Sequence, residues 1–266
     1  MNSRPSNLCI HATAAAILLL CLACGQRKPD KIPPRLVLTP VVRPEIARVI
    51  PHDSTAFTQG LLFYKGKLYE STGLYGHSSV RILNPLDGSI EKRVSVDTAV
   101  FGEGLGVSSD RFVQLTWREH QAIIYRVGDL SRYGWYDLEG EGWGLTFDGS
   151  RWILSDGSDT LFFRDTKFRV VKKLPVTLDG APLKRLNELE FAEGLVFANV
   201  WYNDRIYAIS PVDGKVKKVV DCAELVRKAG VDSPDKVLNG IAYCPPTGTY
   251  YVTGKKWGVM FEVRIP

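Results

Sequence analysis

A short β-type segment recurs five times along the chain, and it constrains the fold more strongly than any other sequence feature. Each copy alternates apolar and polar residues, as is typical of a strand with one buried face. The copies begin at Lys67, Arg111, Arg151, Leu195 and Thr249. Successive copies start 44, 40, 44 and 54 residues apart. Repeats of this length are typical of propellers and related repeat architectures.

The residues around each copy indicate how many strands one unit contains. A strand and a turn precede every copy, and four copies are followed by two longer strands around a tight turn. Asn-Pro-Leu-Asp-Gly at 84–88 and Ser-Pro-Val-Asp-Gly at 210–214 favour turns, because Pro, Asp and Gly each suit turn geometry. Four strands in each of five units predict an all-β, five-bladed β-propeller with antiparallel blades.

The fifth copy is followed by one strand instead of two. The segment Pro44–Asp53, at the other end of the repeat region, has a strand pattern and would supply the missing outer strand. Such an N-terminal strand would close the last blade and leave no open sheet edge. One helix is expected at Cys222–Ala229, ended by Gly230. We therefore expect one propeller domain over 44–266 and no second domain.

An apolar run precedes this domain. Ala14–Ala23 follows a short basic segment and is too short to cross a bilayer, which takes about 20 residues. It has the character of the apolar core of a signal peptide, which predicts a signal peptide over 1–23.

The residues that end this run resemble the lipobox of bacterial lipoproteins. Leu20–Gly25 places a small residue directly before Cys24, although Cys21 stands where the pattern prefers Leu. We expect lipidation of Cys24, and the alternative is plain cleavage near Ala23. Either outcome predicts an exported protein, and lipidation predicts a lipoprotein anchored at the cell envelope on its periplasmic or surface side.

The segment from 24 to 43 is rich in Pro and basic residues and is expected to be a flexible tether. Two cysteines lie in the domain, Cys222 and Cys244. In an oxidising compartment they could form a disulfide or stay as two buried thiols, and the sequence leaves both open.

Charge and histidine content argue against two classes of function. The net charge is only +5, without the basic stripe of a nucleic-acid-binding protein. Of four histidines, His11 lies in the predicted signal peptide, and no H-x-x-x-H pair occurs. We therefore expect neither nucleic-acid binding nor a metal site.

Equivalent positions of the five repeats should converge on the channel mouth of a propeller. They carry chemically different side chains, whereas scaffold positions would tend to repeat one residue. The candidates are Gln59, Glu103, Trp143, Asn187 and Asn239 at the start of the inner strands, and Trp117, Trp201 and Lys255 at the end of the next strands.

Nine short motifs around these positions occur in a characteristic order. They are Phe-Thr-Gln-Gly-Leu, Phe-Gly-Glu-Gly, Gln-Leu-Thr-Trp, Gly-Trp-Gly-Leu, Ser-Asp-Gly-Ser, Asn-Glu-Leu-Glu, Ala-Asn-Val-Trp, Leu-Asn-Gly-Ile-Ala-Tyr and Thr-Gly-Lys-x-Trp. Together they resemble the plant and bacterial type of glutaminyl-peptide cyclotransferase over about residues 44–266. The resemblance implies a five-bladed propeller that converts N-terminal glutaminyl residues of peptides or proteins to 5-oxoproline and releases ammonia. It implies no metal and no other cofactor.

This activity needs a proton carrier and groups that hold the amide oxygen. We expect Glu103 to carry the proton, because two glycines flank it and an apolar surround would raise its pKa. The alternative is a structural ion pair with Lys255. Gln59, Asn187 and Lys255 are candidates to stabilise the oxyanion, and the alternative is polar capping of the inner strands.

Aromatic side chains are expected to form the substrate-binding walls. These are Phe57, Phe101, Trp117, Trp143 and Trp201. Two further tryptophans, Trp135 and Trp152, are interpreted as blade packing.

The sequence is also compatible with two rival functions. One is a ligand-binding propeller without catalysis. Another is a metal-dependent, lactonase-like propeller that would use Glu103, Asn187 and Asn239. A serine hydrolase is disfavoured because G-x-S-x-G is missing from the sequence. A closed ring needs no edge partner, so a monomer is expected.

Overall fold

The structure, a computed structural model, describes residues 38–266. The predicted signal peptide, Cys24 and most of the predicted tether lie outside the described residues. No helix within 38–266 has the length and apolar character needed to cross a membrane.

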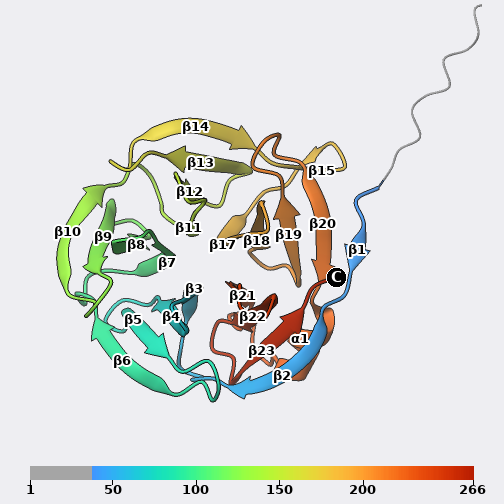
Figure 1. Cartoon of the computed structure of the whole chain (residues 1–266), viewed down its shortest axis with the longest axis horizontal. Coiled ribbons are helices and arrows are strands. Elements are labelled where there is room, and N and C mark those ends of the chain that lie inside the picture. Colours follow the sequence, from blue (N-terminus) through green and yellow to red (C-terminus); the bar gives the residue numbers. More distant parts are fainter. Residues whose placement is uncertain (1–37) are drawn as a thin grey trace, which may run out of the picture. The chain divides into compact units, whose positions relative to one another are not determined.

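Five blades, each built on four antiparallel strands, surround a central axis, as the sequence predicted (Figure 1). The sheet of the fourth blade carries one additional outer strand. The first blade consists of β3 (Thr58–Tyr64), β4 (Lys67–Thr72), β5 (Ser79–Leu83) and β6 (Ile90–Ser95). The second consists of β7 (Gly102–Val107), β8 (Arg111–Thr116), β9 (Gln121–Arg126) and β10 (Arg132–Asp137). The third consists of β11 (Leu145–Phe147), β12 (Trp152–Leu154), β13 (Thr160–Arg164) and β14 (Val170–Pro175). The fourth consists of β17 (Leu186–Ala192), β18 (Leu195–Val200), β19 (Arg205–Ile209) and β20 (Val216–Asp221). The fifth consists of β21 (Leu238–Cys244), β22 (Thr249–Gly254), β23 (Val259–Arg264) and β2 (Glu45–Pro51).

The five recurring sequence segments form the second strand of each blade, counted from the axis: β4, β8, β12, β18 and β22. A two-stranded hairpin, β15 (Thr177–Leu178) and β16 (Ala181–Pro182), follows the third blade. The predicted helix is α1 (Ala223–Ala229), which ends at Gly230 in the left-handed conformation that favours glycine (φ 66°).

The ring is closed by the strand exchange that the sequence predicted. β2 pairs antiparallel with β23, so the last blade combines strands from both ends of the described chain (Figure 1). A shorter strand, β1 (Val41–Val42), pairs in parallel with β20 on the outside of the fourth blade. Because β1 falls inside the predicted tether of 24–43, the propeller extends to positions before 44.

Glycines let the inner strands of neighbouring blades approach closely. A Cβ atom on Gly60, Gly104 or Gly144 would lie 2.5, 2.6 or 2.0 Å from a backbone atom of the next blade. No real Cβ tolerates such distances, so these positions need glycine to keep the inner strands in place.

Apolar side chains fill the spaces between blades. One cluster packs β13 against β18 and β19, and another packs β20 and α1 against the fifth blade.

Cys222 and Cys244 are both buried and both free, so the disulfide alternative is not realised. Trp152 is buried between the second and third blades, which agrees with its interpretation as blade packing. Trp135, however, is 53% exposed on the outer strand β10, so its interpretation as blade packing was wrong.

Candidate active site

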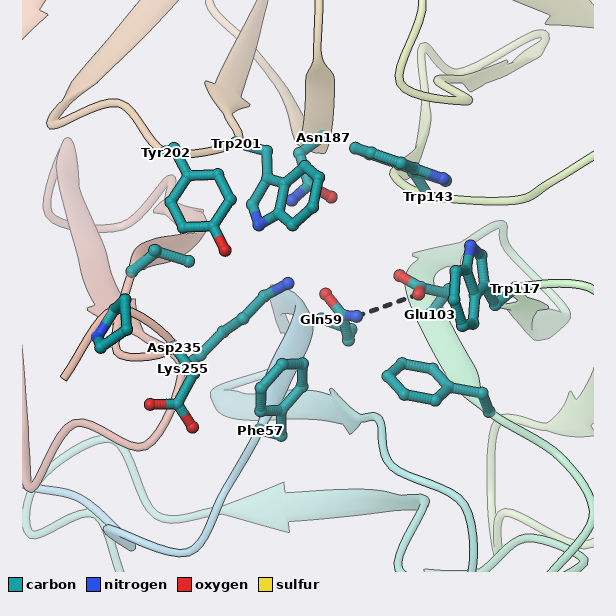
Figure 2. A pocket seen from close by; sticks show the side chains of 13 residues that line it. Phe57, Gln59, Glu103, Trp117, Trp143, Asn187, Trp201, Tyr202, Asp235 and Lys255 are labelled. Atoms are coloured by element: carbon teal, nitrogen blue, oxygen red, sulfur yellow. Dashed lines mark hydrogen bonds between the residues drawn. The ribbon is translucent and has the colours of Figure 1, made fainter.

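A pocket of about 230 Å³ is lined by all nine catalytic and substrate-binding side chains that the sequence suggested (Figure 2). These are Phe57, Gln59, Phe101, Glu103, Trp117, Trp143, Asn187, Trp201 and Lys255. They come from all five blades. Sequence reasoning missed four further lining residues, Tyr202, Pro234, Asp235 and Val237. Tyr202 lies in the loop between β18 and β19, and the other three lie in the segment between α1 and β21.

The topology explains why these residues meet. The inner strands begin at this face of the ring, and Gln59 and Glu103 are the second residues of β3 and β7. The second strands end at the same face, so Trp117, Trp201 and Lys255 directly follow β8, β18 and β22. Residues up to almost 200 positions apart therefore share one mouth.

Glu103 is the buried acid of the pocket. It is 5% exposed, and its Oε1 accepts a hydrogen bond of 2.9 Å from Nε2 of Gln59 (Figure 2). Burial raises the pKa of Glu103 well above its ordinary value; the positive charge of Lys255 opposes this rise, whereas Glu141 and Glu119 add to it. Among the described residues, no direct ion pair joins Glu103 to Lys255. The structural ion pair considered from the sequence is therefore not formed.

Lys255 is the buried base of the pocket. Burial lowers its pKa to about 8, against the opposing effect of the Glu103 carboxylate. Its Nζ lies 4.7 Å from the centre of the Phe57 ring, within the range of a cation–π contact. With a pKa near 8, the amine remains mostly charged at neutral pH and can stabilise negative charge on a ligand.

The two amides of the pocket are held differently. Gln59 lies between Glu103 and Asn239, whose Nδ2 lies 3.3 Å from Oε1 of Gln59. The backbone oxygen of Asn187 accepts a 2.6 Å hydrogen bond from Ser155, which fixes the strand entry. Within 38–266 the side-chain amide of Asn187 makes no hydrogen bond, although the residue is buried. Asn187 thus offers an unoccupied amide to a ligand.

The aromatic residues form two packed groups on the pocket walls. The rings of Trp143 and Trp201 meet edge to face at 5.5 Å between centroids. Phe101 packs edge to face against both Phe57 and Trp117, at 6.1 and 5.5 Å. Edge-to-face contacts are a preferred arrangement of aromatic rings, and here they give the pocket packed, apolar walls.

Glu141 is a residue that sequence reasoning missed. Its Oε2 accepts hydrogen bonds from the indole N–H groups of Trp117 (2.9 Å) and Trp143 (3.0 Å). Its Oε1 accepts one from Arg118, whose guanidinium stacks 3.8 Å above the Trp117 ring. The sequence places Glu141 two residues before Trp143, but this spacing carries no signal that one carboxylate joins two indoles.

Other motif residues have structural contacts. The buried carboxylate of Glu188 accepts backbone hydrogen bonds from Leu61 and Ile241, and thereby joins the inner strands of three blades. Asp156 accepts a hydrogen bond from the backbone N–H of Ser158, as expected of a turn residue. No group of three or more His, Cys, Asp or Glu side chains within 38–266 is arranged to hold a metal ion.

The fold and pocket define a class of protein: a five-bladed propeller whose channel mouth presents a buried carboxylic acid, two amides and an amine between aromatic walls. Such a set of groups is suited to proton transfer at an uncharged amide.

The chain belongs to the glutamine cyclotransferase family, which it matches over residues 14–265. It is 39% identical over 228 residues to the glutaminyl-peptide cyclotransferase of Arabidopsis thaliana, covering 83% of this chain and 71% of the plant protein. It is also similar to the crystal structure of Myxococcus xanthus glutaminyl cyclase, with 35% identity and a TM-score of 0.81 over 85% of this chain and 98% of that one. The family resemblance expected from the sequence is thus confirmed.

Proposed function

We propose that this protein is a glutaminyl-peptide cyclotransferase that acts on peptides or proteins with N-terminal glutamine, and that Glu103 is its proton carrier. The observation that carries the proposal is the convergence of Glu103, Gln59, Asn187 and Lys255 in one aromatic pocket. Membership of the glutamine cyclotransferase family supports the activity.

The substrate provides much of the reaction geometry itself. Its α-amine attacks the γ-amide carbon of the same residue, so the two reacting groups are already held close together. The bond between the α-nitrogen and the γ-carbon forms, and the bond between that carbon and the amide nitrogen breaks.

The proton follows a short path through Glu103. Its carboxylate accepts a proton from the attacking amine and delivers it to the departing amide nitrogen, which leaves as ammonia. One carboxylate can serve both steps because both nitrogens are bound to the same tetrahedral carbon. The raised pKa of Glu103 suits this exchange, since transfer is most efficient when the pKa lies near the working pH.

Negative charge develops on the γ-carbonyl oxygen during attack. In the proposed mechanism the Lys255 ammonium and the Asn187 amide donate to this oxygen. Gln59, which donates a hydrogen bond to Glu103, orients that carboxyl group. Donors fixed in advance in a pocket of low polarity stabilise such charge more than water does. The indole walls would exclude water and select a flat, uncharged amide.

The test is to incubate the purified protein with a peptide that begins with glutamine, and to measure ammonia and the loss of one ammonia from the peptide mass. Glu103→Gln should lower kcat by about 100-fold or more, because it removes the proton carrier and keeps the shape. Equal activity of wild type and variant would show that Glu103 is not the carrier. Binding of the peptide without any cyclisation would favour the ligand-binding alternative.

We also propose that the protein is an exported lipoprotein anchored through Cys24. The support is the apolar run Ala14–Ala23 and the lipobox-like residues after it. When cells are grown with a labelled fatty acid, the wild-type protein should incorporate the label. The Cys24→Ser variant should remain unlabelled and should be released from the membrane fraction. Equal membrane association of both forms would contradict lipidation at this residue.

A further inference from the structure

A second cavity, of about 410 Å³, lies beside the first and has a basic lining. Its titratable lining residues are His77, Arg81, Arg93 and Lys256, and no carboxylate from the described part of the chain lines it. Phe57 lines both cavities, so the two cavities adjoin at this residue.

The two cavities open at the same end of the propeller. Lys255 lines the first and Lys256 lines the second, and both amines lie close to the Phe57 ring, at 4.7 and 5.7 Å from its centre. An extended peptide advances by about 3.3–3.6 Å per residue. A peptide with its first side chain in the first cavity would therefore reach the second with its second or third residue.

One wall of the second cavity is built by a buried arginine. Arg81 is 2% exposed; its Nη1 binds Asp53 at 2.9 Å and its Nε binds Ser79 at 3.0 Å. Its Nη2 makes no hydrogen bond within 38–266 and remains available as a donor. Glu70 and His52 lie behind Arg81 and hold it in place, with Glu70 at 3.5 Å from Nη1 and His52 bound to Glu70.

The other cations differ in how far their charge is already balanced. Lys256 forms an ion pair with Asp235 at 2.5 Å. Arg93, at the exposed side, donates to the backbone oxygen of His77 at 3.3 Å and has no carboxylate partner among residues 38–266. Arg93 therefore supplies the charge that a ligand would neutralise, and Arg81 supplies a fixed donor deeper in the cavity.

We propose that this cavity is a specificity subsite that receives an acidic side chain at the second or third position of the peptide substrate. The inference rests on the proposed function, because it assigns the cavity to the peptide chain beyond the reacting glutamine. A guanidinium is the preferred partner of a carboxylate, since its N–H groups form charge-assisted hydrogen bonds in fixed geometry.

The experiment compares kcat/KM for three peptide amides, Gln-Ala-Ala, Gln-Glu-Ala and Gln-Ala-Glu. At least one acidic peptide should be used about fivefold better than the neutral one, the size expected of a partly exposed ion pair. This preference should decrease as ionic strength rises, because Arg93 is exposed to screening. In Arg93→Gln the ratio should fall towards one.

Arg132→Gln provides a matched control, because Arg132 is also an exposed arginine on the outer strand of a blade but does not line the cavity. It should keep the wild-type ratio. An equal loss in both variants would mean that net charge, and not the subsite, sets the preference, and would overturn the inference. Equal use of all three peptides by the wild type would overturn it as well. If no peptide is cyclised, the proposed function itself is wrong and the subsite falls with it.

Discussion

At the residue scale, the two titratable groups of the pocket are shifted in opposite directions by the same cause. Burial favours the neutral form of each, so the pKa of Glu103 rises well above its ordinary value and that of Lys255 falls to about 8. The proposed mechanism needs the charged forms instead, the carboxylate of Glu103 and the ammonium of Lys255. Activity should therefore rise as Glu103 loses its proton and fall as Lys255 loses its own.

This opposition predicts the falling limb of the pH profile. In the wild type, kcat/KM should decline through a pH of about 8 as Lys255 deprotonates. Lys255→Arg should move this limb above a pH of about 10, because a guanidinium keeps its proton there. The profile of kcat/KM against pH checks this, with Lys217→Arg on the outer strand β20 as the control. A limb that stays near 8 in Lys255→Arg would assign it to another group.

Glu141 gives a prediction about positioning. Its carboxylate raises the pKa of Glu103 and holds the indoles of Trp117 and Trp143. Glu141→Gln removes the charge and keeps an acceptor oxygen, so the rising limb of the pH profile should move to lower pH. Glu141→Ala also frees both indoles and should lower kcat/KM by about tenfold or more.

The matched control is Glu139→Gln, which removes an exposed carboxylate two residues earlier. It should leave the rising limb in place. If Glu141→Gln and Glu141→Ala give the same profile and the same rate, the two indole hydrogen bonds contribute nothing to catalysis.

At the scale of the element, the decisive strand is β2, because it completes the last blade from the other end of the repeat region. Its residues alternate between exposed positions and positions that are partly or fully buried. Ile50 is 1% exposed and packs in an apolar cluster between the fifth and first blades, whereas its neighbour Val49 is 57% exposed.

This alternation predicts a difference between neighbouring substitutions. Ile50→Ala should lower the free energy of unfolding by about 2–5 kcal/mol, because it leaves a cavity in the core. Val49→Ala should change it by no more than about 0.5 kcal/mol. Urea denaturation of the purified protein measures both. Similar, small effects of the two would show that β2 is not part of the cooperative ring.

At the scale of the whole molecule, the ring depends on close contact between inner strands. Gly60, Gly104 and Gly144 leave room for the neighbouring backbone, and Glu188 joins three inner strands through its buried carboxylate. The same contacts bring the starts of the inner strands to one mouth. The site is therefore a consequence of how the blades are packed.

Much of this arrangement was predictable from the sequence. The alternation of apolar and polar residues identifies the five similar segments as strands. Because each segment marks one repeat unit, their number determined the blade count. Equivalence of the repeats then placed Gln59, Glu103 and Asn187 at a common mouth. What these residues do in catalysis remains a proposal that the experiments above test.

Only the tertiary structure decided the lateral contacts. The sequence left open whether Cys222 and Cys244 are joined, and it did not indicate that Glu103 binds Gln59, that Glu141 holds two indoles, or that Trp135 is exposed. These contacts join residues on different strands or blades and depend on blade tilt and side-chain packing. The alternation along a strand shows which of its residues face the core. It carries no information about which distant side chain lies in contact with them.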